Sequence, residues 1–103
     1  MDELKGLTAL EALDFSFCGR LTNVDGLRNL NSLQFLNMIA CVQLKSVRQL
    51  HTVGSLKVIG LPTSITQKEM EELKSKLPEV KIIKGDQNSS KYEYSAAVKK
   101  ARQ

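Results

Sequence analysis

The chain has 103 residues, of which 42% are hydrophobic and 25% are charged. This composition suits one small globular domain and excludes a wholly disordered chain. The formal net charge of +4 arises largely at the C-terminal end, where Lys91, Lys99, Lys100 and Arg102 are accompanied by one acidic residue, Glu93. The remainder is nearly balanced, so the total charge does not indicate a nucleic-acid-binding domain. No apolar stretch is long enough to span a membrane, and the acidic first residues do not resemble a signal peptide, so we expect a cytoplasmic protein.

Apolar residues recur along the chain with a period of 23 residues. The first complete unit has eight such positions, namely Leu10, Leu13, Phe15, Cys18, Leu21, Val24, Leu27 and Leu30. The second unit repeats them as Leu33, Leu36, Met38, Cys41, Leu44, Val47, Leu50 and Val53. The pattern continues at Leu56, Ile59 and Leu61, and extends back to Leu4 and Leu7. A fixed period of this length indicates stacked structural units, each burying its apolar side against its neighbours.

Each unit begins with the alternation of a short strand. Leu13 and Phe15 are two residues apart, which sends both side chains to the same face. Cys18 follows at the strand's end, where a small thiol can enter the core and bond weakly to loop backbone. The later apolar positions are three residues apart, a spacing that suits 3₁₀ or irregular turns.

The pattern L-x-x-L-x-[LFM]-x-x-C-x-x-[LV] resembles the leucine-rich repeat of the cysteine-containing type, which occurs in many protozoan proteins and in ubiquitin-ligase receptor subunits. The resemblance covers residues 4–83, and it predicts units at about 1–9 (partial), 10–32, 33–55 and 56–84. It implies an α/β solenoid, a right-handed coil with short parallel strands on its concave face and irregular or 3₁₀ turns on its convex side. It also implies a module for protein–protein interaction.

A helix that caps the C-terminal end of the stack is predicted at residues 66–77. Thr66 and Glu69 have the spacing of a capping box, with Thr66 as the N-cap. The apolar face of this helix, directed at the core, is expected to consist of Met70, Leu73 and Leu77. A last short strand follows, with Ile82 in register with Ile59.

The two ends of the chain depart from the repeat. Residues 1–9 supply only a partial unit, which favours a piece of a longer repeat protein; a complete N-terminal cap and self-association through this end are the alternatives. Residues 85–103 form a polar linker and a basic tail. Their composition favours disorder, with a short helix that carries Tyr94, Val98 and Ala101 on one side as the alternative.

Catalysis finds little support in the residues. His51 is the only histidine, no nucleophile motif or phosphate-binding loop accompanies it, and we predict no enzyme, no metal and no cofactor. Cys18 and Cys41 are explained by the repeat as structural core thiols. Basic residues recur at Lys5, Arg28, His51 and Lys74, which we interpret as a solvated surface.

The concave face is the predicted binding surface for a protein partner, whose identity the residues do not indicate. Its candidate residues are Asp14, Ser16, Phe17, Phe35, Asn37, Ile39 and Val58. An apolar patch rimmed by polar groups is typical of an interaction site, although some of these side chains could instead pack against the tail or each other. The alternative function is targeting or nucleic-acid binding through the basic tail.

Overall fold

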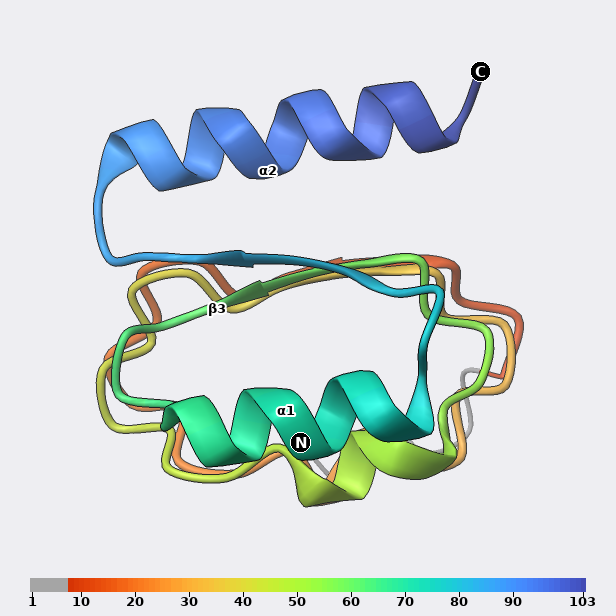
Figure 1. The fold of residues 1–103 in the computed structure, drawn as a ribbon, viewed down its shortest axis with the longest axis horizontal. Helices are drawn as coiled ribbons and strands as arrows, with labels where there is room; N and C mark the ends of the chain where they lie inside the picture. The colour runs from red at the N-terminus through yellow and green to blue at the C-terminus, as the bar shows by residue number, and fades with distance from the viewer. Residues whose placement is uncertain (1–7) are drawn as a thin grey trace.

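The structure, a computed structural model that describes residues 8–103, is a four-stranded parallel β-sheet with helices on both faces (Figure 1). In chain order the strands are β1 (Ala12–Asp14), β2 (Phe35–Asn37), β3 (Val58–Leu61) and β4 (Lys81–Lys84). The 3₁₀ helices η2 (Asp25–Leu27) and η3 (Arg48–Thr52) and the helix α1 (Gln67–Lys76) lie on one side of the sheet, and α2 (Asn88–Ala101) lies on the other. The prediction of an α/β fold with parallel strands is confirmed.

The strand register follows the repeat. Leu13 is paired with Leu36, Leu36 with Ile59, and Ile59 with Ile82, so each partner lies 23 residues further along the chain. The 23-residue spacing therefore determines both the strand order and the side chains that share a face, because side chains in a strand alternate between faces.

The main core lies between the sheet and the segments that connect the strands. We call the face that carries Leu13, Leu36, Ile59 and Ile82 the inner face. It packs against fully buried residues of the connecting segments and α1, among them Leu27, Leu50 and Leu73. Burial of a leucine side chain contributes about 1.5–3 kcal/mol, so this cluster is the main source of stability. Its β1 end is less covered, because Leu10, Leu13, Phe15 and Cys18 are only partly buried.

Helix α1 packs against the main core in the segment where the sequence predicts a helix. Thr66 is its N-cap, and the Thr66 hydroxyl accepts a hydrogen bond from the backbone N–H of Glu69 at 3.2 Å. Leu73 is fully buried, Leu77 is buried and Met70 is half-buried.

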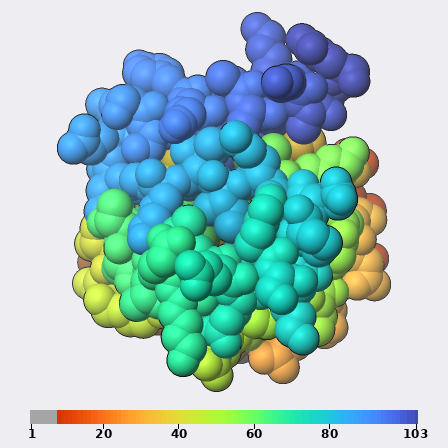
Figure 2. All heavy atoms as spheres, viewed as in Figure 1, coloured from red at the N-terminus to blue at the C-terminus, as the bar shows by residue number. Residues whose placement is uncertain are grey.

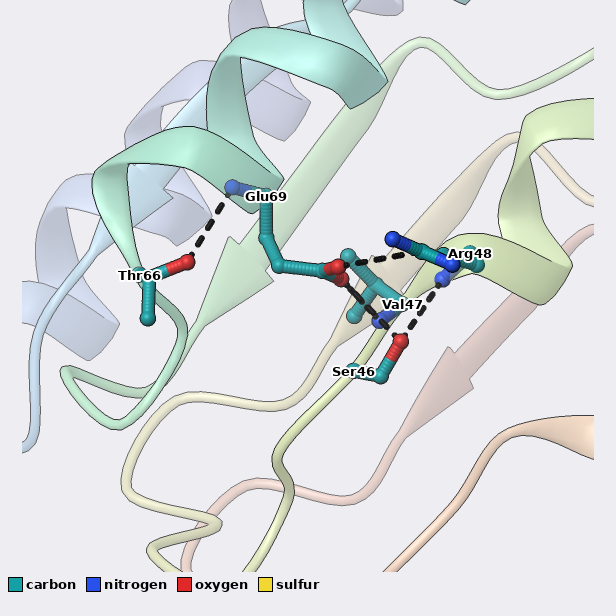
Figure 3. A network of polar contacts seen from close by, with 5 residues as sticks. All are labelled: Ser46, Val47, Arg48, Thr66 and Glu69. Atoms are coloured by element: carbon teal, nitrogen blue, oxygen red, sulfur yellow. Dashed lines mark hydrogen bonds and ion pairs between the residues drawn. The ribbon is translucent and has the colours of Figure 1, made fainter.

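The capping-box interpretation is only half right, because the Glu69 carboxylate does not return to its own helix. It accepts hydrogen bonds from the Val47 backbone N–H at 2.9 Å and from the Ser46 hydroxyl at 3.1 Å (Figure 3). It also pairs with Arg48 at 3.4 Å. Glu69 thus binds the backbone N–H that precedes η3, and so attaches α1 to the neighbouring segment.

The two cysteines are free thiols at equivalent positions of successive units. Cys41 is fully buried, and its Sγ donates to the Phe15 carbonyl oxygen at 3.0 Å. Burial raises the pKa of the Cys41 thiol, which keeps it protonated and able to donate. Cys18, in the first unit, is half-buried.

The partial unit predicted at residues 1–9 falls mostly outside the described residues. Leu4, Lys5 and Leu7 belong to that part of the chain.

Candidate partner-binding surface

The second face of the sheet, which was predicted to be concave and exposed, is largely covered by α2. We call it the outer face. Its apolar residues form a second cluster beneath the helix, made of Phe35, Ile39, Ala40, Val58, Ile83 and Tyr94. Phe35 is 3% exposed and Val58 is 1% exposed. The expectation that Phe35, Ile39 and Val58 form an exposed patch is therefore wrong, and the alternative that they pack against the tail is correct, because the tail is a helix that lies on them.

Helix α2 reaches the sheet with a narrow stripe of side chains. Tyr94 is its buried residue and is 7% exposed. Ala97 and Val98, three and four residues later, are half-buried on the same side. Burial raises the pKa of the Tyr94 hydroxyl, and the charge of Asp14 raises it further. In the space-filling view, side chains fill the space between α2 and the rest of the molecule (Figure 2).

Cations at the two ends of α2 lie over aromatic rings of the outer face. The Lys91 ammonium is 5.9 Å from the centre of the Phe17 ring, and the Arg102 guanidinium is 4.7 Å from the centre of the Phe35 ring. Such pairs contribute about 0.5–1 kcal/mol at exposed sites. Two basic residues of the tail, Lys91 and Arg102, therefore take part in attaching the helix to the sheet.

The turn between β4 and α2, at Gly85 and Asp86, reverses the chain so that α2 lies over the sheet (Figure 1). The Asp86 carboxylate accepts a hydrogen bond from the Thr63 backbone N–H at 3.0 Å and another from the Thr63 hydroxyl. A Cβ atom on Gly85 would lie 2.5 Å from the Cβ of Ser90, so only glycine permits this close approach to the first turn of α2. The linker is a specific turn, which explains why the tail lies on the sheet.

Two predicted site residues close the turns that follow the strands. An Asp14 carboxylate oxygen accepts from the Ser16 backbone N–H at 2.8 Å, and in the next unit the Asn37 side-chain oxygen accepts from the Ile39 N–H at 3.1 Å. These are Asx turns, in which a side chain replaces a backbone acceptor. Asn37 is buried, so its role is structural, whereas Asp14 is exposed and Ser16 is half-buried.

The same turns place Phe17 and Ala40 in the left-handed region, at φ of 62° and 64°. These positions are 23 residues apart, so the conformation recurs with the repeat. Phe17 is 47% exposed, which is unusual for a large aromatic residue and makes it part of the accessible surface.

Helix α2 leaves a groove open along each of its sides. The first groove, of about 300 Å³, lies between α2 and β1, and its lining includes Asp14, Phe35, Tyr94, Ser95 and Arg102. The second, of about 420 Å³, lies beside β3 and β4 and is lined by Lys57, Val58, Glu79, Lys81, Ala97, Lys100 and Ala101. The accessible outer side is thus a helix with two flanking grooves.

The recurring basic residues that the structure describes are Arg28, His51 and Lys74. Arg28 and Lys74 are exposed, and the Lys74 ammonium donates to the Val80 carbonyl oxygen. His51 is half-buried, and its Nε2 has no hydrogen-bond partner among residues 8–103. Over the same residues, no group of three or more His, Cys, Asp or Glu side chains is arranged to hold a metal ion.

Comparisons with protein-family models, with curated proteins and with solved structures gave no match. None of the helices in the described part of the chain is long and apolar enough to cross a membrane.

Proposed function

We propose that this chain is a leucine-rich-repeat solenoid that serves as a non-catalytic protein-interaction module, and that its partner contacts the outer side of the sheet around α2. The supporting observation is the composite surface of that side, where one helix covers the apolar strands and two grooves remain open beside it. Parallel strands with a 23-residue register and 3₁₀ segments opposite them support the repeat assignment.

The burial of the central apolar residues changes which side chains would contact the partner. Phe35, Ile39 and Val58 support α2 from beneath, so they act through the helix. The exposed residues Asp14, Phe17, Tyr92 and Ser95 are available for direct contact. Tyr92 is 73% exposed, and aromatic residues are enriched at protein interfaces.

Affinity capture from native extract with mass spectrometry tests this proposal. The chain is compared with a variant that carries Asp14→Arg and Ser95→Arg, both at exposed positions of the first groove. The matched control carries Asp25→Arg and Ser75→Arg, which make the same chemical changes at exposed positions of η2 and α1. Circular dichroism verifies that both variants are folded.

A specific partner should be lost from the first variant and kept by the control. If the first variant keeps the partner and the control loses it, the binding surface must lie on the other side of the sheet, and the proposed location is wrong. The alternative function, nucleic-acid binding through the charge of the tail, would be favoured if the chain captures nucleic acid that is removed by nuclease and by high salt.

A further inference from the structure

The groove beside β3 and β4 brings together three lysines from separate elements. Lys57 precedes β3, Lys81 begins β4, and Lys100 lies in the last turns of α2. All three are exposed and line the same groove of about 420 Å³. Glu79 is the one acidic residue in the lining, so the described groove has three cations and one carboxylate.

These lysines are available to an external anion. Among residues 8–103, the ion pair in the structure joins Arg48 to Glu69, outside this groove. None of the three lysine ammonium groups forms an ion pair with a carboxylate of these residues, Glu79 included. Convergent cations raise the local concentration of an anionic partner and accelerate its association.

The floor of the groove is apolar. Its apolar lining consists of Val58, which is 1% exposed, Ala97, which is half-buried, and Ala101, which is exposed, so the two alanines supply the accessible apolar surface. A small volume with an apolar floor and a charged rim accommodates a few side chains rather than a folded domain. The matching ligand is a short segment that carries both carboxylates and apolar groups.

We propose that this groove binds a short acidic segment of a protein partner, with carboxylates at Lys57, Lys81 and Lys100 and apolar side chains against Ala97 and Ala101. The inference rests on the proposed function, since it specifies the chemistry of the partner. A peptide is favoured over nucleic acid because none of the described lining residues is aromatic, and single-stranded nucleic acid is usually held by base stacking as well as by charge.

The test uses the full chain and three fluorescent probes in anisotropy titrations at low and moderate salt. The first probe is a peptide in which aspartate and leucine alternate. The second has the same length and charge, with serine in place of leucine, and the third is a single-stranded oligonucleotide. We expect the first probe to bind best, and to bind more weakly as salt screens the charges.

The groove variant carries Lys57→Glu, Lys81→Glu and Lys100→Glu. The control variant carries Arg20→Glu, Lys45→Glu and Lys68→Glu, which change the net charge equally at exposed positions outside the groove. The groove variant should bind the aspartate–leucine peptide about tenfold more weakly or worse, and the control should stay within about twofold. Circular dichroism of both variants accompanies the titrations. The single substitution Lys100→Gln, at an exposed helix position, should weaken binding of the aspartate–leucine peptide about threefold. It provides the test if the triple variant does not fold.

Three results would overturn the inference: no binding of the aspartate–leucine peptide to the full chain, equal losses in the two triple variants, or tighter groove-dependent binding of the oligonucleotide. Such a failure is distinguishable from failure of the proposed function. The capture experiment depends on Asp14 and Ser95, which line the other groove.

Discussion

The Glu69 carboxylate on α1 accepts a hydrogen bond of 2.9 Å from the backbone N–H of Val47, immediately before η3 (Figure 3). Val47 is the N-cap residue of η3 and has no side-chain capping bond of its own. The end of one unit's 3₁₀ helix is therefore satisfied by a side chain 22 residues away. This contact joins α1 to the repeat unit that precedes it.

Glu69→Ala should destabilise the protein by about 1–3 kcal/mol, because it leaves the Val47 amide and the Ser46 hydroxyl without their acceptor. Chemical denaturation gives the value. Glu71→Ala, at an exposed position of the same helix, is the control and should change stability by about 0.5 kcal/mol or less. Equal effects of the two substitutions would mean that the Glu69 contacts contribute nothing.

The same carboxylate predicts a pH dependence. Burial raises the pKa of Glu69, but the hydrogen bonds from Val47 and Ser46 and the charge of Arg48 outweigh it, so the net pKa lies below the ordinary 4.5. A carboxyl whose pKa is lowered in the folded state stabilises the protein above its unfolded pKa and loses that effect as the pH falls through the folded value.

The free energy of unfolding of the wild type should therefore exceed that of Glu69→Gln at neutral pH, and the difference should shrink as the pH falls below 4.5. Urea titrations across this range measure both proteins. A difference that stays constant down to strongly acidic pH would show that the ionised carboxylate is not the stabilising form.

Leu73→Ala should be more costly than Thr66→Ala. Leu73 is fully buried in the main core, and deletion of such a side chain costs about 2–5 kcal/mol. Thr66 supplies the single N-cap bond of α1, whose loss costs about 1 kcal/mol. Denaturation midpoints give the ranking, and the reverse order would show that α1 packs less tightly than its burial indicates.

The repeat predicted the sheet well because its signal depends only on spacing. Leu13, Leu36, Ile59 and Ile82 lie in one register, and the helix that begins after Thr66 follows its local cap. The hydrogen-bond partners of the Glu69 carboxylate could not be predicted from the sequence. The capping-box pattern assigns the carboxylate to the N-terminus of its own helix, whereas in the fold it bonds to Val47 and Ser46 of the neighbouring segment. These contacts depend on α1 and η3 being neighbours in the fold, and the sequence pattern does not indicate that proximity.

The helical tail and its packing on the sheet were predicted only as alternatives, for a different reason. Its apolar stripe contains Tyr94, Ala97 and Val98 among polar residues, so the segment resembles a solvated tail. This stripe indicates packing only when it is considered together with the apolar outer face, because Phe35, Ile39 and Val58 would otherwise form an exposed apolar patch. Those residues were identified correctly as a coherent patch, but their partner lies within the chain.

Gly60→Ala should destabilise the sheet by about 1–3 kcal/mol. An added Cβ would lie 2.7 Å from the Asn37 side-chain oxygen and 2.9 Å from Cγ1 of Ile39, both buried beneath α2. Gly54→Ala is the control, because nothing lies within 4 Å of its added Cβ. Thermal denaturation compares them, and a neutral Gly60→Ala would mean that the outer cluster is loosely packed.

The central claim is that α2 is an integral layer of the fold, attached through Tyr94. Tyr94→Ala should release α2 while the main core stays folded, because the two clusters are on opposite faces of the sheet. Tyr94→Phe keeps the ring and should leave the helix in place. The surface proposed to bind a partner exists only if this attachment holds.

The most direct test is therefore an NMR measurement on the wild-type chain that combines ring-to-methyl nuclear Overhauser effects with amide hydrogen exchange. We predict contacts from the Tyr94 ring to the methyl groups of Val58 and Ile83, together with slowed exchange within residues 92–101, both lost in Tyr94→Ala. Random-coil shifts and unprotected amides over residues 88–101 of the wild type, with no contacts from the Tyr94 ring to the sheet, would contradict the claim.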